Sequence, residues 1–209
     1  MPIRRGDKPL RIMSMLFRVA MSQLEYLMPS AALRTYFSVY YLFESDAESF
    51  SDCERAGIAQ LRFILTGTGV LHFIDGSSTR CSGAMIVGPT TGAMQFDVEG
   101  PFRMFGLGIL PPGWDALTGA SAADFTDRII AADTLFPRIN ERLAALQKMT
   151  TLAEMAEAAE TLLKPIVEQA SPETAAFARM VEDWLASSPS PSVCDLHCRS
   201  QLSERQLTR

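Results

Sequence analysis

The spacing of apolar residues changes at Pro111-Pro112-Gly113, and this change constrains the fold more than any other feature of the sequence. Before it, short runs rich in aromatic and β-branched residues alternate with turns that contain glycine and proline, a pattern typical of a small sandwich or barrel. After it, apolar residues recur every three or four positions, which is the period of amphipathic helices. We therefore expect an α+β protein, with a β-rich barrel or sandwich over residues 24–113 and a helical connector over residues 114–186.

The candidate strands also suggest candidate pocket residues. The strands are expected at residues 35–43, 60–65, 70–74, 93–98 and 102–109. Turn signals separate them at Gly67, Gly69, Asp75-Gly76, Gly88-Pro89 and Gly100-Pro101. By residue type, the side chains that suit a small-molecule pocket are Tyr36, Tyr40, Phe63, His72 and Gln95. Each is an equally good candidate for the core, since alternation along a strand turns some side chains inward.

The composition excludes several classes of protein. The 209-residue chain is 47% hydrophobic and 21% charged, so it is not a disordered chain. It has no uninterrupted apolar run of 18 residues, and we expect neither a transmembrane helix nor a membrane partner. In a chain of this length, four cysteines do not indicate a disulfide framework, and we expect free thiols in a reducing cytoplasm.

Charge is unevenly distributed along the chain. The formal net charge of -5, taken alone, argues against nucleic acid as the main partner. The first 20 residues nevertheless carry five basic residues against one acidic residue. We interpret residues 1–23 as a basic N-terminal arm, and a mis-called start codon and a targeting peptide are the alternatives.

Local capping chemistry predicts where the helices begin. Ser121 with Asp124 and Thr151 with Glu154 have the spacing of a capping box, and Ser171-Pro172 combines an N-cap with proline at the first helical position. The helix that starts at Ser171 has an apolar stripe formed by Phe177, Met180, Val181, Trp184 and Leu185. We interpret this stripe as core or as a contact in a homodimer.

The last residues predict a helix-turn-helix. Residues 187–191 are a Ser/Pro linker, and residues 192–209 follow it. Within them, Ser203 and Gln206 form a reciprocal capping box, while Leu202 can pack on Leu207 as a hydrophobic staple. Two short helices joined by a tight turn, the second started in this way, describe the motif that places a recognition helix against DNA.

At this point the sequence resembles a known family. Residues 195–209, DLHCRSQLSERQLTR, resemble the first helix-turn-helix of AraC/XylS-type transcriptional regulators, whose pattern is D-L-A-x-x-x-G-L-S-x-R-x-L-x-R-x-F. Residues 111–136 resemble the junction between sensor and helices in some members. The resemblance implies a cytoplasmic bacterial transcription regulator, in which a cupin-like N-terminal sensor domain binds a small effector and the C-terminal part binds operator DNA.

The same resemblance assigns residue roles and exposes departures. It implies that Arg205, Thr208 and Arg209 point outward from the second helix and contact DNA. Gln201 stands where the family often has glycine in the turn, and His197 and Cys198 replace small residues. The chain stops inside the second helix, so it looks like a truncated regulator. We expect residues 1–209 alone to bind an operator poorly.

Metal and enzyme functions find little support in the sequence. Cys194, His197 and Cys198 could share one helix face, but the other histidine, His72, is distant in sequence, and we expect no metal and no cofactor. No G-x-S-x-G motif or Cys–His pairing indicates catalysis, so we expect no enzyme. The alternative function is a stand-alone small-molecule-binding or cupin-like enzyme domain whose C-terminal tail only resembles the motif. The reading frame downstream of codon 209 would discriminate between the two.

Overall fold

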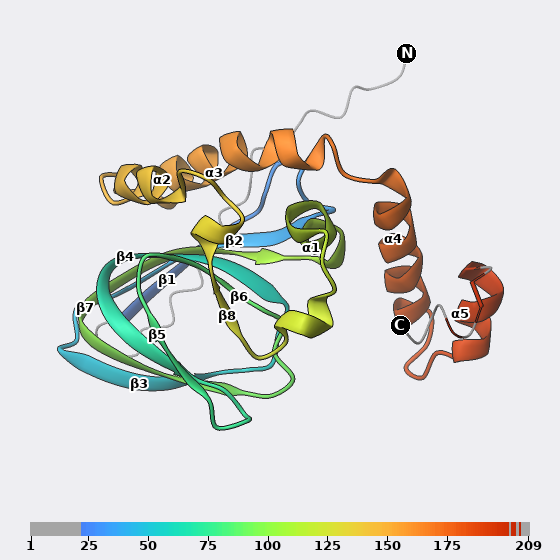
Figure 1. Cartoon of the computed structure of the whole chain (residues 1–209), viewed down its shortest axis with the longest axis horizontal. Coiled ribbons are helices and arrows are strands. Elements are labelled where there is room, and N and C mark those ends of the chain that lie inside the picture. The colour runs from blue at the N-terminus through green and yellow to red at the C-terminus, as the bar shows by residue number, and fades with distance from the viewer. Residues whose placement is uncertain (1–21, 201, 204, 206–209) are drawn as a thin grey trace, which may run out of the picture.

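The computed structural model describes residues 22–200, 202, 203 and 205. Within them one antiparallel sheet lies beside several helices, so the expected α+β class is confirmed (Figure 1). Most of the predicted N-terminal arm, residues 1–21, lies outside the described residues, while residues 22 and 23 belong to the first strand. No helix in the described part of the chain is both long enough and apolar enough to cross a membrane.

The described strands form a single eight-stranded sheet with the order β1-β2-β7-β4-β6-β8, in which β3 also pairs with β7 and β5 with β4. The strands are β1 (Ser22–Leu27), β2 (Phe37–Ser45), β3 (Ser49–Glu54), β4 (Ala59–His72), β5 (Ser78–Cys81), β6 (Ala84–Val87), β7 (Met94–Ile109) and β8 (Ile129–Ala131). The sheet curves strongly rather than dividing into two stacked sheets (Figure 1).

The two longest strands correct the predicted strand boundaries. The candidate strands 60–65 and 70–74 merge largely into β4, and 93–98 and 102–109 merge into β7. Gly67 and Gly100, expected in turns, lie inside these strands at φ values of 81° and 76°. The β4–β7 register shifts between Ile64 and Thr66 and again between Thr66 and Thr68. The glycines therefore mark bulges, which bend a strand without ending it.

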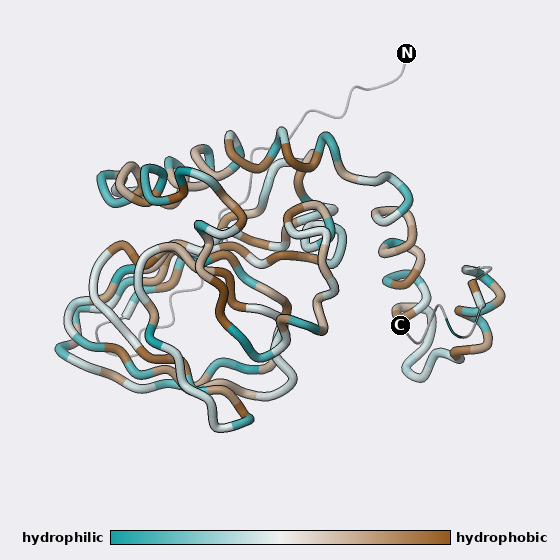
Figure 2. Tube along the Cα trace, in the orientation of Figure 1, coloured by the Kyte–Doolittle hydropathy of each residue, from teal (hydrophilic) through white to brown (hydrophobic). Residues whose placement is uncertain are grey.

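One face of the sheet is sealed by helices. Side chains that alternate along β2, β4 and β7 form its core, and Phe105 stacks against both Tyr40 and Phe63, with ring centroids 6.1 Å and 5.9 Å away. The helices that complete this part of the molecule are α1 (Pro111–Thr118), α2 (Ile139–Leu146) and α3 (Leu152–Val167). Figure 2 shows apolar stretches of the sheet close to these helices. Because this core holds the sheet against the helices, it also positions the side chains on the other face of the sheet.

Helix starts follow the predictions where the capping residues are complete. Thr151 and Glu154 form the reciprocal capping box of α3, and the Ser171 side chain accepts hydrogen bonds from two backbone N–H groups at the start of α4 (Pro172–Ala186). The predicted helix from Ser121 is wrong. Residues Ala122–Phe125 form only a short 3-10 turn, Asp127 adopts a left-handed φ of 54°, and β8 then pairs with β6.

The C-terminal region is formed by α4, the linker and α5 (Val193–Ser200). The apolar stripe of α4 is partly uncovered among the described residues, with Phe177 39% and Leu185 55% exposed and the other three side chains half-buried. The Trp184 indole N–H donates to the Ser192 carbonyl at 2.8 Å and so joins α4 to the start of α5. Of the predicted second helix, Arg205 is helical and exposed, whereas Gln206, Thr208 and Arg209 lie outside the described residues.

Candidate functional site

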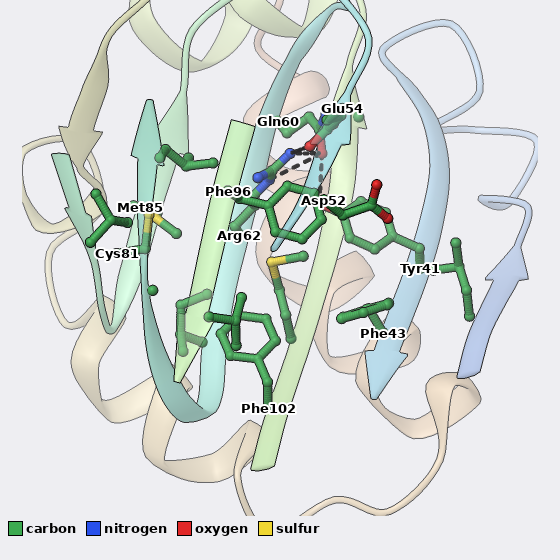
Figure 3. Close-up of a pocket in the computed structure, with 18 of the residues that line it drawn as sticks. Tyr41, Phe43, Asp52, Glu54, Gln60, Arg62, Cys81, Met85, Phe96 and Phe102 are labelled. Carbon is green, nitrogen blue, oxygen red and sulfur yellow. Dashed lines mark hydrogen bonds and ion pairs between the residues drawn. The ribbon is translucent and has the colours of Figure 1, made fainter. Parts of the chain in front are cut away.

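A cavity of about 360 Å³ opens on the face of the sheet opposite the helix-covered core (Figure 3). Small-molecule sites commonly have volumes of about 300–1,000 Å³, so this cavity is at the small end of that range. Gln60, Arg62 and Ile64 of β4 line it, while Leu61, Phe63 and Leu65, which alternate with them along the strand, face the helices. Strand alternation therefore divides β4 between a sealed core and an open site.

The wall of the cavity is mostly apolar. Its aromatic and aliphatic side chains include Phe43, Ile64, Leu71, Met85, Phe96, Val98, Phe102 and Met104. Phe43 and Phe102 lie with ring centroids 6.2 Å apart, and Phe50 contacts both of these rings from β3. Such a wall excludes water from one end of a bound molecule and offers it aromatic contacts.

A polar cluster occupies the other end of the cavity, and Figure 3 shows Glu54, Gln60 and Arg62 side by side there, away from Phe102. Arg62 Nη2 lies 2.5 Å from Glu54 Oε2 and 3.0 Å from Gln60 Oε1. Arg62 Nε also donates to Gln60 Oε1, and the Gln60 amide donates to Glu54 Oε1. The Tyr41 hydroxyl donates to Gln60 Oε1 at 2.6 Å. These contacts join β2, β3 and β4 through side chains.

The two charged residues of this cluster form one ion pair. Arg62 is only 4% exposed, and its ion pair with Glu54, which is 31% exposed, accounts for its burial. Burial alone would lower the pKa of Arg62, but the nearby Tyr41 and Glu54 outweigh burial and raise the pKa. Burial raises the pKa of Tyr41 to about 12, although the Arg62 charge opposes this rise. At neutral pH the cavity therefore presents a charged guanidinium and a protonated phenol.

Two glycines of β7 make room for side chains of β2 on the cavity face. A Cβ atom at Gly106 would overlap the ring and hydroxyl of Tyr41, and one at Gly108 would overlap Ser38 Oγ. Tyr41 consequently lies across the strand backbone, where any larger residue at position 106 would displace it. The shape of the cavity depends on glycine at these positions.

The structure places the five sequence-predicted pocket residues elsewhere. Tyr40 and Phe63 are buried in the helix-facing core, and Tyr36 packs at the edge of that core. His72 and Gln95 are opposite each other on β4 and β7, where His72 Nε2 lies 2.8 Å from Asp97 Oδ2. None of the five lines the cavity. For the four residues that lie in strands the reason is strand phase, since neighbouring residues of a strand face opposite sides of the sheet, whereas Tyr36 lies in the turn before β2.

Four residues of the candidate site were not predicted from the sequence: Tyr41, Glu54, Gln60 and Arg62. The sequence contains one indication of this polar cluster. Arg62 interrupts the apolar run of the candidate strand 60–65, and an arginine on a buried strand needs a paired acid. Glu54 could not be identified as that acid, because its strand, β3, was not predicted.

Metal-ligating side chains do not gather in the described part of the chain, where no group of three or more His, Cys, Asp or Glu residues could hold an ion. Cys194 and Cys198 are exposed free thiols on α5. The expectation of no metal and no cofactor stays a prediction.

Comparisons with known proteins give one family and several structures. A family model described as a domain of unknown function, DUF6597, matches residues 25–131, which include every cavity-lining residue except Leu24. No curated protein matches the sequence.

Among similar solved structures is a cupin superfamily protein from Desulfitobacterium hafniense, with 20% identity, a TM-score of 0.34, and coverage of 44% of this chain and 81% of that one. A protein of unknown function from Rhizobium leguminosarum has 14% identity, a TM-score of 0.35, and coverage of 52% and 97%. A bacterial pirin in complex with nickel(II) from Escherichia coli has 13% identity, a TM-score of 0.35, and coverage of 45% and 47%.

Proposed function

The chain belongs to the DUF6597 family, and we propose that it is a transcription regulator of AraC type whose DUF6597 domain senses a small molecule in the cavity. The observation that carries the proposal is the cavity itself, which combines an apolar wall with a polar cluster at one end. Few but well-placed polar groups in an apolar pocket are the usual architecture of a small-molecule site.

Binding fits this site better than catalysis. Tyr41, Glu54, Gln60 and Arg62 use most of their hydrogen-bonding capacity on one another. A general acid or base must reach the proton that it transfers, and its pKa must lie near the working pH. Tyr41, with a pKa of about 12, does not meet the second condition. The cluster therefore suits recognition of a bound molecule, and we propose no enzymatic activity.

Contacts lead from the cavity to the C-terminal helices. Leu24 and Tyr26 of β1 line the cavity, and α3 packs against both β1 and β2. Beyond β1, the backbone N–H of Ser30 donates to Glu160 Oε1 of α3 at 2.8 Å. In turn, α1 contacts α3 and α4, and α4 contacts α5. A ligand that shifts β1 or β2 would therefore act on the packing of α3, and through it on the helices that follow.

The C-terminal segment would provide DNA binding in this proposal. Its support is the resemblance of residues 195–209 to the AraC-type motif, together with an observed helix α5 and the exposed, helical Arg205. Arg205, Thr208 and Arg209 would contact operator DNA, Arg most readily through guanine O6 and N7. A homodimer formed through the helical connector would present two such segments to the operator.

Immunoprecipitation of DNA crosslinked to the protein as its native gene encodes it, in its source cells, tests this function, whereas residues 1–209 alone are expected to bind an operator poorly. We expect enriched fragments that share a sequence motif, and an Arg205→Ala variant should lose that enrichment. An Arg138→Ala variant, which changes an exposed arginine outside the C-terminal segment, is the matched control and should retain it. Enrichment that is absent in the wild type, or unchanged in Arg205→Ala, would favour the alternative, a stand-alone small-molecule-binding domain.

A further inference from the structure

The guanidinium of Arg62 has hydrogen-bonding capacity left over. A guanidinium carries five N–H donors. The Nε donor and the Nη2 donors bond to Gln60 and Glu54. Among the described residues no hydrogen bond is made by Nη1, although the residue is 96% buried and lines the cavity. Nη1 is not one of the fully buried side-chain atoms without a partner in the described chain, so it is accessible from the cavity that Arg62 lines. A ligand oxygen that reaches Nη1 can accept its hydrogen bonds, and a bond to a charged donor is among the stronger ones.

The charges around Arg62 restrict which acceptor fits. Glu54 already pairs with the guanidinium, and Asp52 on the same strand also lines the cavity. The guanidinium is therefore already neutralised by one acid, and Asp52, which is exposed, adds no positive charge. A carboxylate ligand beside Arg62 would also lie beside Glu54, whose like charge would repel it and already compensates the guanidinium. An uncharged oxygen could accept from Nη1 without that penalty.

We propose that the cavity takes an uncharged, largely apolar small molecule whose carbonyl oxygen accepts hydrogen bonds from Arg62 Nη1, such as an amide, ester, lactone or ketone. The apolar body of this molecule lies against Phe43, Phe96 and Phe102 at the other end. This inference rests on the proposed effector-binding function and names the chemical class of the effector.

A matched set of fragments tests the head group directly. The probes are phenylalkyl fragments of four to eight carbons, each prepared as a carboxamide, a carboxylate and a primary amine. Their binding to the full chain is measured at pH 7 by saturation-transfer NMR and titration calorimetry. One charge-assisted hydrogen bond corresponds to about 10- to 100-fold in affinity. We expect each carboxamide to bind at least about 10-fold more tightly than its carboxylate and its amine.

A cavity-filling variant separates this inference from the function on which it rests. Val39 lines the cavity from β2, and Val39→Trp should remove binding by filling the space. Carboxylates or amines that bind more tightly than carboxamides, in a way that Val39→Trp abolishes, would leave effector binding intact and overturn the carbonyl inference. Fragments of all three classes that fail to bind, or that bind Val39→Trp equally well, would overturn the effector site and the inference with it.

Variants of the ion pair identify the donor. The double variant Arg62→Met with Glu54→Gln removes the guanidinium without leaving an unpaired acid, and carboxamide affinity should fall at least about 10-fold. The matched control is the double variant Arg138→Met with Glu141→Gln, which removes an exposed Arg–Glu pair and should leave the affinity unchanged. Arg62→Lys keeps the positive charge but not the planar donors, and it should show the same loss if the double variant does not fold. Unchanged affinity in a folded Arg62 variant would overturn the proposal.

Discussion

Tyr40 and Tyr41 are neighbours in the chain, yet they belong to two different environments. Tyr40 is fully buried on the helix-covered face, stacks on Phe105, and has a hydroxyl without a hydrogen-bond partner among the described residues. Tyr41 is half-buried on the cavity face, and its hydroxyl donates to Gln60. One face of the sheet is organised by close packing and the other by polar contacts around an open space. The comparison separates the residues that hold the fold from those available to a ligand.

Truncating the packed face should have the largest effect. Phe105 is 0% exposed and contacts Tyr40 and Phe63, so Phe105→Ala should lower the free energy of unfolding by about 3–5 kcal/mol. Phe96→Ala, which removes a half-buried ring from the cavity wall, should cost less than half as much. Urea unfolding followed by circular dichroism measures both. Equal losses at the two positions would mean that the cavity wall is packed as tightly as the core.

Breaking the ion pair on the cavity face should have the next largest effect. Arg62→Met leaves Glu54 without its partner and should cost about 2–4 kcal/mol, less than a fully buried pair because Glu54 is partly exposed. Adding Glu54→Gln removes the unpaired charge and should recover most of that loss. Both variants can be compared with wild type by urea unfolding. A double variant as unstable as Arg62→Met would show that the packing of Arg62, rather than its charge, stabilises this face.

The two tyrosines allow a smaller and more direct test. Tyr41→Phe removes a hydrogen bond to Gln60 and should lower the free energy of unfolding by about 1 kcal/mol. Tyr40→Phe removes a buried hydroxyl that has no hydrogen-bond partner within the described residues, so stability should stay within about 0.5 kcal/mol of wild type or rise. Thermal and urea unfolding of the two variants, measured in parallel, give the difference. If Tyr40→Phe lowered the free energy of unfolding more than Tyr41→Phe, the assignment of the helix-covered face as apolar and the cavity face as polar would be wrong.

The smallest effect is expected at an exposed part of the sheet, where Asp97 contacts Ser51 and His72. The hydrogen bond from Ser51 and the contact with His72 lower the pKa of Asp97. Stability from a lowered acid pKa is present above the unfolded-state value, about 4, and is lost as pH falls through the folded-state value. Asp97→Asn should therefore lower the melting temperature slightly at pH 7, and the difference from wild type should shrink towards pH 3. A difference that stays constant with pH would assign the effect to packing.

Helix starts were predictable because capping is local chemistry. Thr151 with Glu154, and Ser171 before Pro172, satisfy backbone N–H groups within a few residues, whatever the rest of the chain does. The same logic failed at Ser121, where no side-chain cap forms and β8 pairs with β6 instead. There a long-range strand pairing outweighed a local helix signal.

The candidate site was less predictable because it depends on strand phase and register. Gly67 and Gly100-Pro101 read as turns in the sequence, but pairing between β4 and β7 carries both strands through them. Whether Tyr40 or Tyr41 faces the cavity depends on which side the helices cover, and no local pattern contains that information. In the sequence, the only indication of the site is Arg62, which interrupts an apolar run. Glu54, which pairs with Arg62, and Tyr41, which donates to Gln60, come from strands that meet β4 or its neighbours only in the folded protein.

The glycines beneath Tyr41 have a consequence for how this protein diversifies. Because Tyr41 lies where a side chain at position 106 would stand, and Ser38 where one at position 108 would stand, the contour of the cavity depends on two missing methyl groups. A single nucleotide change turns a glycine codon into one for alanine or valine. Such a change would reshape the cavity from below while leaving Tyr40, Phe63 and Phe105 on the opposite face untouched. If the proposed effector site is correct, substitution of Gly106 or Gly108 would change which ligand fits while the packed core on the opposite face stays the same.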